Sequence, residues 1–279
     1  MLANMPLPRR RAGETLQAWT IRAAHHLEPR IPATHRFSHL TAAAIQGMRT
    51  PSTPALHQWV HVTGFEAERG LRRHGVDGHK SRRPVETVDV DGLRCSNPIA
   101  AWAECSELLP IDDLVIMGDG LLARGGAIAT LDDLERIARS RAGARGAKAL
   151  RAAMRLVRAG TDSARETSLR LLLVRAGLPE PEINAPLFDD RGRLIGHGDL
   201  AWPAERIVVE YEGRQHAEDP RQFTIDIGRI DRILEAGYRH IRVDDHRLRE
   251  RDGVVSTVRR AFASAHAREG TRSRQRRAH

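Results

Sequence analysis

A short apolar run that ends on two acidic residues is the strongest constraint on how the C-terminal part of this chain folds. Ile207–Val209 leads directly into Glu210 and Glu212. Because successive side chains of a strand point to opposite faces, the two glutamates share one face, roughly 6.5–7 Å apart along the chain. The pattern predicts a buried strand that ends in concentrated negative charge. Spacing alone leaves open an exposed edge strand with two solvated glutamates.

Further candidate ligands flank this strand. Asp199 precedes it by a short turn, and His216 follows it. Carboxylates that lie close together repel one another and are costly to bury. A cation between them removes that cost, and oxygen ligands with an imidazole suit Mg²⁺ or Mn²⁺. This pattern favours a magnesium or manganese site among these side chains.

The order of these acids resembles the PD-(D/E)XK endonuclease superfamily, in which an aspartate is followed by an acidic pair on the next strand. More narrowly, V-V-E-Y-E-G-R-Q-H resembles the E-Y-D-G-x-x-H signature of domains related to the very-short-patch repair endonuclease, domain-of-unknown-function family 559. The flanking stretches E-T-S-L-R-L-L-L-V-R-A-G-L and D-I-G-R-I-D-R-I-L-E-A-G-Y extend the likeness. It covers about residues 161–248, under a third of the chain.

The resemblance implies a helix, a mixed three- or four-stranded sheet, a packing helix and a metal site that hydrolyses DNA phosphodiesters. Matched by position, it implies five catalytic residues: Glu166, Asp199, Glu210, Glu212 and His216. Of these, Asp199, Glu210 and Glu212 would be the metal ligands. The superfamily usually has lysine where this chain has Glu212, so Glu212 and His216 would serve as a ligand and a base. A nucleic-acid-binding or regulatory protein that keeps the fold without cutting is the alternative.

Glu166 also fits a structural role. The stretch Ser163-Ala-Arg-Glu166 has the form of a capping box, in which Ser163 accepts from the Glu166 backbone N–H and the glutamate reaches back. A glutamate engaged in a cap need not touch a metal. Both roles stay open from the sequence.

A basic stretch precedes the endonuclease-like region. Six cations recur at steps of three or four, which would hold them on one helical face: Arg141, Arg145, Lys148, Arg151, Arg155 and Arg158. Like charges on one face repel, and nucleic-acid phosphates would relieve that repulsion. We expect these residues to bind nucleic acid; a solvated helix face is the alternative. Gly143 and Gly146 weaken the first turn, which leaves open a helix that starts near Ala147.

Composition agrees with a polyanionic partner. The net charge is +9, which favours nucleic acid, and DNA is the expected partner. The two cysteines, Cys95 and Cys105, are too few for a disulfide framework. No signal-peptide pattern and no apolar run of membrane-spanning length occurs. We expect a cytoplasmic protein with no membrane association.

The N-terminal half resembles regions associated with abortive-infection antitoxins, through F-S-H-L-T-A-A-A-I-Q-G-M and D-L-V-I-M-G-D-G-L-L-A-R. The resemblance implies a protein partner in a defence or toxin–antitoxin system. Within this half the residues predict a basic loop or hairpin over Arg72–Arg83. The histidines form no tight ligand pattern, so we expect them to be scattered on the surface: His25, His26, His35, His39, His57, His61, His74 and His79.

The expected class is α+β (α/β), with a restriction-endonuclease-like mixed sheet flanked by helices after a mixed α/β region. We predict five segments: a poorly structured residue range 1–35, an α/β region at 36–140, a basic helix at 141–160, the endonuclease-like domain at 161–266 and a disordered basic tail at 267–279.

Overall fold

The computed structural model describes residues 6–51, 58–66, 70–213 and 220–277. The chain divides into two compact units, Met1–Ala159 and Gly160–His279, which are described separately below. Each unit holds one mixed sheet with helices packed around it, so the expected α+β class is confirmed.

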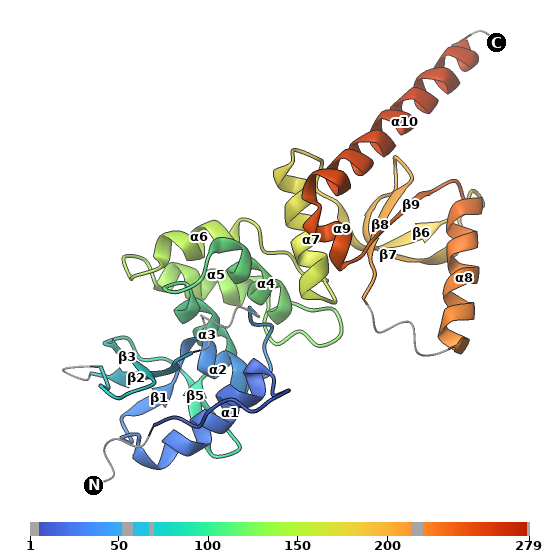
Figure 1. Ribbon diagram of the computed structural model, residues 1–279. Helices are drawn as coiled ribbons and strands as arrows, with labels where there is room; N and C mark the ends of the chain where they lie inside the picture. Colours follow the sequence, from blue (N-terminus) through green and yellow to red (C-terminus); the bar gives the residue numbers. More distant parts are fainter. Residues whose placement is uncertain (1–5, 52–57, 67–69, 214–219, 278–279) are drawn as a thin grey trace. The chain divides into compact units, whose positions relative to one another are not determined.

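The N-terminal unit is built on a five-stranded sheet (Figure 1). Its strand order is β3-β2-β1-β5-β4. The strands are β1 (His35–Phe37), β2 (Val60–Phe65), β3 (Val76–Ser81), β4 (Thr87–Val90) and β5 (Leu93–Ser96). β2 is antiparallel to β1 and parallel to β3. The segment expected to be a basic loop or hairpin therefore contains a paired strand, because β2 supplies an edge for Val76–Ser81.

Helices complete this unit: α1 (Leu16–Leu27), the short η1 (Glu28–Arg30), α2 (His39–Ile45), α3 (Pro98–Cys105), α4 (Ile111–Leu121), α5 (Leu131–Ser140) and α6 (Ala147–Met154). Side-chain caps set several of their starts. Asn97 accepts from the Ala100 backbone N–H ahead of α3, and Thr130 forms a capping box with Asp133 ahead of α5.

The range 1–35, expected to be poorly structured, contains the twelve-residue helix α1. Thr15 caps it by accepting from the Ala18 N–H, and the helix buries Trp19 and Leu27. The sparse apolar residues of this stretch are thus concentrated on one buried face. Burial of that face stabilises the helix.

The C-terminal unit has the order helix, three strands, helix, strand (Figure 1). These elements are α7 (Ala164–Arg175), β6 (Glu182–Phe188), β7 (Leu194–Trp202), β8 (Ile207–Tyr211), α8 (Pro220–Glu235) and β9 (Arg239–Val243). The sheet order is β6-β7-β8-β9; the first two pairings are antiparallel and the last is parallel. Helices α9 (Asp245–Arg249) and α10 (Arg251–Arg277) follow.

Turn chemistry fixes this topology locally. Asp189 accepts from the backbone N–H groups of Arg191 and Arg193 in the β6–β7 hairpin. Gly237 adopts φ 78° directly after α8, a left-handed conformation that glycine tolerates and that ends the helix. The parallel β8–β9 pair then requires a crossover, which α8 supplies.

Each face of this sheet has its own core. Leu200, Val209 and Ile241 face α7 and α10 in one apolar cluster. Ala201 and Val208 lie in a second cluster with Ile233 of α8. Alternate residues of β7 and β8 therefore point to opposite sides, as strand geometry requires.

Two boundary predictions change. Helix α6 covers only Ala147–Met154. Gly146 adopts φ 78°, a left-handed conformation that an α-helix cannot continue through, so the residues before it lie outside the helix. At the other end of the chain, α10 continues to Arg277, so most of the segment expected to be a disordered tail is helical. Within the described residues, no helix combines the length and the apolar character that a membrane crossing needs.

Candidate active site

Two neighbouring strands bring Asp199 and Glu210 together. The β7–β8 register pairs Leu200 with Val209. Continued by one residue, the same register sets Asp199 opposite Glu210. Since Leu200 and Val209 face α7 and α10, the two acids point to the side of the sheet that α8 covers.

Glu210 is buried and accepts hydrogen bonds from two neighbouring side chains. Its carboxylate accepts two hydrogen bonds from the Arg229 guanidinium, at 2.7 and 2.9 Å, and lies 2.7 Å from His240 Nε2. Burial raises the pKa of this carboxyl, but the bonds from His240 and Arg229 outweigh burial and bring the pKa to about 2. Glu210 is therefore ionised, and two neighbouring groups compensate its charge.

Asp199 has the opposite electrostatic situation. Burial is the main cause that raises its pKa to about 7, and the negative charges of Glu166 and Glu210 raise it further. The Oδ2 atom of Asp199 accepts from the Tyr211 backbone N–H at 2.9 Å. This bond and the charge of Arg229 offset only part of the rise in pKa. Near neutral pH the carboxyl is thus poised between its protonated and ionised forms.

Glu166 performs the structural role that the sequence left open. Its backbone N–H donates to Ser163 Oγ at 3.1 Å, while its carboxylate accepts from the Asp162 N–H at 2.8 Å. The expected reach back goes to Asp162 rather than to Ser163. Glu166 is also buried, and its charge acts on Asp199, so the cap and the acidic site share one residue.

The remaining two predicted catalytic residues are placed differently. Glu212 lies just after β8, is 41% exposed, and forms an ion pair with Arg242. It does not join Asp199 and Glu210 in a compact group of three possible ligands. His216 lies outside the described residues.

The six-cation face is not formed. Only Lys148 and Arg151 lie within α6. Arg155 is the C-cap, and Arg141 and Arg145 precede the helix. Arg141 forms an ion pair with Glu107 at 2.8 Å, which holds its charge inside the unit. The periodic spacing was real, but Gly146 interrupts the helix that would have aligned it.

Arg158 is also held internally. Its backbone N–H donates to Asp119 at 2.8 Å, and its side chain donates to the Arg155 and Val157 carbonyls. The exposed cations of the set are Arg145, Lys148, Arg151 and Arg155.

Sequence reasoning missed the partners of Glu210. Nothing in the sequence assigned Arg229 to Glu210. His240 was not singled out at all. Its position in β9 offers a signal. The parallel β8–β9 register sets His240 opposite Val208, two residues before the position where Arg242 lies opposite Glu210.

The prediction that the histidines are scattered on the surface is wrong for three of them. His39, His61 and His79 gather in the N-terminal unit, and His39 and His61 are only 2% and 3% exposed. The alternation His61-x-Thr63 and Asp77-x-His79 on two strands was a usable signal, but strand β3 was not predicted.

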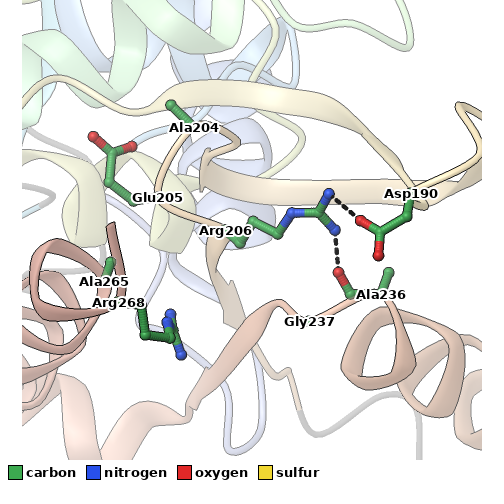
Figure 2. A pocket seen from close by; sticks show the side chains of 8 residues that line it. All are labelled: Asp190, Ala204, Glu205, Arg206, Ala236, Gly237, Ala265 and Arg268. Atoms are coloured by element: carbon green, nitrogen blue, oxygen red, sulfur yellow. Dashed lines mark hydrogen bonds and ion pairs between the residues drawn. The ribbon is translucent and has the colours of Figure 1, made fainter. Parts of the chain in front are cut away.

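A separate hollow of about 260 Å³ lies at the other end of β8 (Figure 2). Arg206 donates to Asp190 at 2.5 Å and to the Ala236 carbonyl there. The Arg206 guanidinium also lies over the Tyr238 ring, 5.5 Å from its centroid. Through these contacts Arg206 joins the start of β8 to the end of α8. Neither Asp199 nor Glu210 lines this hollow, so it is distinct from the acidic site.

Comparisons with known proteins add relatives but no activity. No protein-family model matches the chain, and no solved structure matches it. Two curated proteins are similar, both uncharacterized proteins of Mycobacterium tuberculosis, from strains CDC 1551 / Oshkosh and ATCC 25618 / H37Rv. Each is 28% identical over 209 residues, covering 71% of this chain and 70% of the relative.

Proposed function

We propose that this protein is a metal-dependent endonuclease that hydrolyses DNA phosphodiester bonds at the Asp199–Glu210 site. The observation that carries the proposal is the pairing of two acids on adjacent strands, the buried Glu210 and the half-buried Asp199, whose pKa is raised to about 7. Such a carboxyl lacks sufficient positive charge around it. The superfamily resemblance implies a helix, a mixed three- or four-stranded sheet and a packing helix, and the presence of these elements in the C-terminal unit supports the same proposal.

The donor set fits Mg²⁺ or Mn²⁺. Asp199 and Glu210 offer carboxylate oxygens, the ligands that these hard cations prefer. An ionised carboxylate has about four lone-pair sites, so Glu210 can accept from Arg229 and His240 and still face a cation. Asp199 keeps one oxygen beyond its bond to the Tyr211 N–H.

The chain's own residues would position this chemistry. Arg229 and His240 hold the Glu210 carboxylate in one orientation, and the Tyr211 N–H orients Asp199. A bound divalent cation would polarise the phosphate and lower the pKa of its water. Arg229, 28% exposed, adds positive charge beside the site, where a phosphate would approach.

A cleavage assay tests the proposal. Full-length protein is titrated with Mg²⁺ or Mn²⁺ over plasmid and single-stranded DNA. We expect nicking that Asp199→Asn abolishes, because the variant loses a ligand charge at nearly constant shape. Asp190→Asn is the matched control: it removes an exposed acid of the same unit and should cut like wild type. Metal-dependent nicking that survives Asp199→Asn would overturn the assignment.

One observation favours a second function. Arg229 and His240 already compensate the charge of Glu210, as a structural ion pair would. A nucleic-acid-binding protein of a defence or toxin–antitoxin system, without cutting activity, fits that arrangement. It predicts DNA binding by the wild type but no nicking with either metal.

A further inference from the structure

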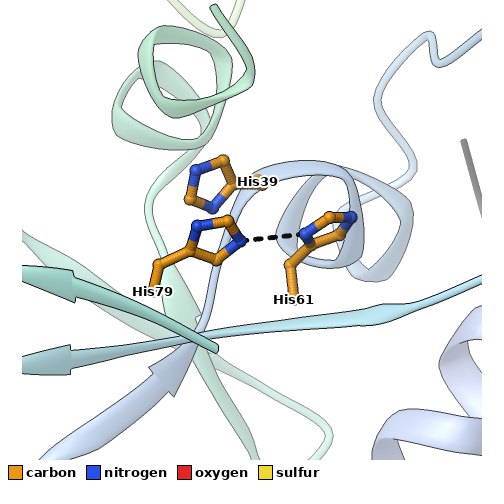
Figure 3. Close-up of side chains that lie close together, drawn as sticks. All are labelled: His39, His61 and His79. Carbon is orange, nitrogen blue, oxygen red and sulfur yellow. Dashed lines mark hydrogen bonds between the residues drawn. The ribbon is translucent and has the colours of Figure 1, made fainter. Parts of the chain in front are cut away.

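Three histidines from distant parts of the sequence meet inside the N-terminal unit (Figure 3). His39 is the first residue of α2, His61 lies in β2 and His79 lies in β3. Each offers a ring nitrogen within 4.8 Å of those of the other two. Among the described residues, no other three potential ligand side chains meet so closely.

The spacing within the group matches a coordination sphere. His61 Nδ1 lies 3.0 Å from His79 Nε2, and Asp77 Oδ2 lies 3.6 and 3.7 Å from these two nitrogens. Ligands at about 2.0–2.2 Å from a tetrahedral zinc ion are about 3.3–3.6 Å apart. The parallel β2–β3 register sets Asp77 opposite His61 and thereby fixes this neighbourhood.

His39 contributes a nitrogen that the protein does not otherwise use. Its Nε2 atom is buried and has no hydrogen-bond partner among the described residues. Its Nδ1 atom lies 2.9 Å from Ser38 Oγ, which also accepts from Thr63 Oγ1 at 2.7 Å. When Nδ1 donates to Ser38, Nε2 presents its lone pair, which is how metal-binding histidines are usually held.

The electrostatics favour neutral rings. Burial is the main cause that lowers the pKa of both His39 and His79, and the neighbouring histidines lower that of His39 further. The neutral imidazole is the form that binds metals. Asp77, Glu107 and Glu104 bring negative charge to His79, which offsets the repulsion a cation would meet from nearby arginines.

Backbone strain and an access route add independent support. His39 adopts φ 51°, a left-handed conformation that is uncommon for residues other than glycine and clusters at functional sites. His39 and His79 line a cavity of about 480 Å³. The cluster can therefore exchange an ion with solvent although His61 is buried.

We propose that His39, His61 and His79 bind one divalent transition-metal ion, with Asp77 as the fourth ligand. Imidazole donors with one carboxylate suit zinc, and nickel or copper less selectively. The present rings are partly stacked, with the His39 and His79 centroids 3.9 Å apart, so binding requires a rotation of the His39 ring. The site lies in a different unit from the acidic pair and uses a different ligand class.

Zinc uptake by full-length, untagged protein tests this proposal. Protein stripped with a chelator is titrated with Zn²⁺, and bound metal is counted by mass spectrometry. We expect one equivalent for wild type and for His74→Gln, which replaces an exposed histidine of the same unit. His39→Gln and His61→Gln should bind at least tenfold more weakly, and Asp77→Asn should weaken binding by less. Asp199→Asn should bind normally, which separates this site from the acidic one.

Co²⁺ provides a spectroscopic check, because a tetrahedral site gives visible absorption that an adventitious octahedral site lacks. His79→Gln keeps the test valid if the two more buried variants do not fold, since the His79 side chain is 15% exposed. Circular dichroism verifies each fold. The proposal is overturned if wild type binds no zinc, or if the folded His79→Gln variant binds zinc as tightly as His74→Gln does.

Discussion

Around Glu210 the C-terminal unit keeps a buried charge, whereas around His39 the N-terminal unit keeps buried rings uncharged. Glu210 stays ionised because Arg229 and His240 bond to it. His39 has its pKa lowered mainly by burial, and two further histidines and two arginines lower it further. The two sites therefore attract cations for different reasons.

That difference defines what each site can bind. In the acidic site an added cation would relieve Asp199, whose charge is poorly compensated, and would share Glu210 with an arginine. In the histidine cluster an added cation would use lone pairs that are otherwise idle. Hard cations suit the first site and borderline transition metals suit the second.

The largest expected effect on stability comes from removing the Glu210 carboxylate. Glu210→Ala should lower the free energy of unfolding by about 3–5 kcal/mol, because it leaves Arg229 and His240 without their shared acceptor in a buried site. Denaturant unfolding of wild type and variant measures the difference.

The exposed pair Glu212–Arg242 is the internal control for that experiment. Its two side chains are 41% and 53% exposed, so Glu212→Gln should change stability by less than about 1 kcal/mol. Equal losses in the two variants would show that Glu210 is not specially compensated.

Asp199, whose charge is poorly compensated, should make the stability of the protein depend on pH. The folded-state pKa of Asp199 is about 7, against the ordinary aspartate value of 3.8. Between these values the folded state holds a proton that the unfolded state has released, so stability falls as pH rises from about 4 to 7. Three pKa units correspond to at most about 4 kcal/mol.

Asp199→Asn should remove this slope and be more stable than wild type at pH 8. Thermal melts across that range compare the two proteins. Mg²⁺ should recover part of the lost stability in wild type but not in the variant. A wild-type profile that matches the variant at every pH would contradict the raised pKa.

The histidine cluster should give a slope of the opposite sign. His39 and His79 have folded-state pKa values below 6.5, so below that pH the unfolded state binds protons that the folded state excludes. Their contribution is complete above pH 6.5 and is lost as pH falls, by up to about 1.4 kcal/mol per pH unit for each histidine. His39→Gln should flatten the acid side of the melting profile, whereas the exposed His74→Gln should leave it unchanged.

The acidic site was readable from the sequence because its parts lie close together in the chain. Asp199 and Glu210 are separated by one turn, and the period of a strand fixes their faces. What periodicity could not supply was their partners. Arg229 reaches Glu210 from α8, and His240 does so from β9, positions that only the crossover brings near.

The histidine cluster was hidden for the same physical reason. Its members are joined by the parallel pairing of β2 and β3, and parallel pairing leaves no local turn signal. For the basic stretch the local pattern predicted too much. Its spacing suggested one long helix, but Gly146 adopts a left-handed conformation, so the helix starts only at Ala147. Local pattern therefore predicted elements better than it predicted which elements meet.

The smallest expected effect concerns the basic stretch, and it asks whether charge outside both sites matters for DNA. Lys148 and Arg151 remain exposed on α6. If both contact phosphates, reversing them to Glu should flatten the slope of log affinity against log salt by up to about 1.8, at about 0.9 for each contact on duplex DNA. Arg136 and Arg139 of α5 provide the matched double reversal, since they are exposed and paired with acids of their own helix. Equal slopes for the two double variants would mean that the α6 cations are simply solvated.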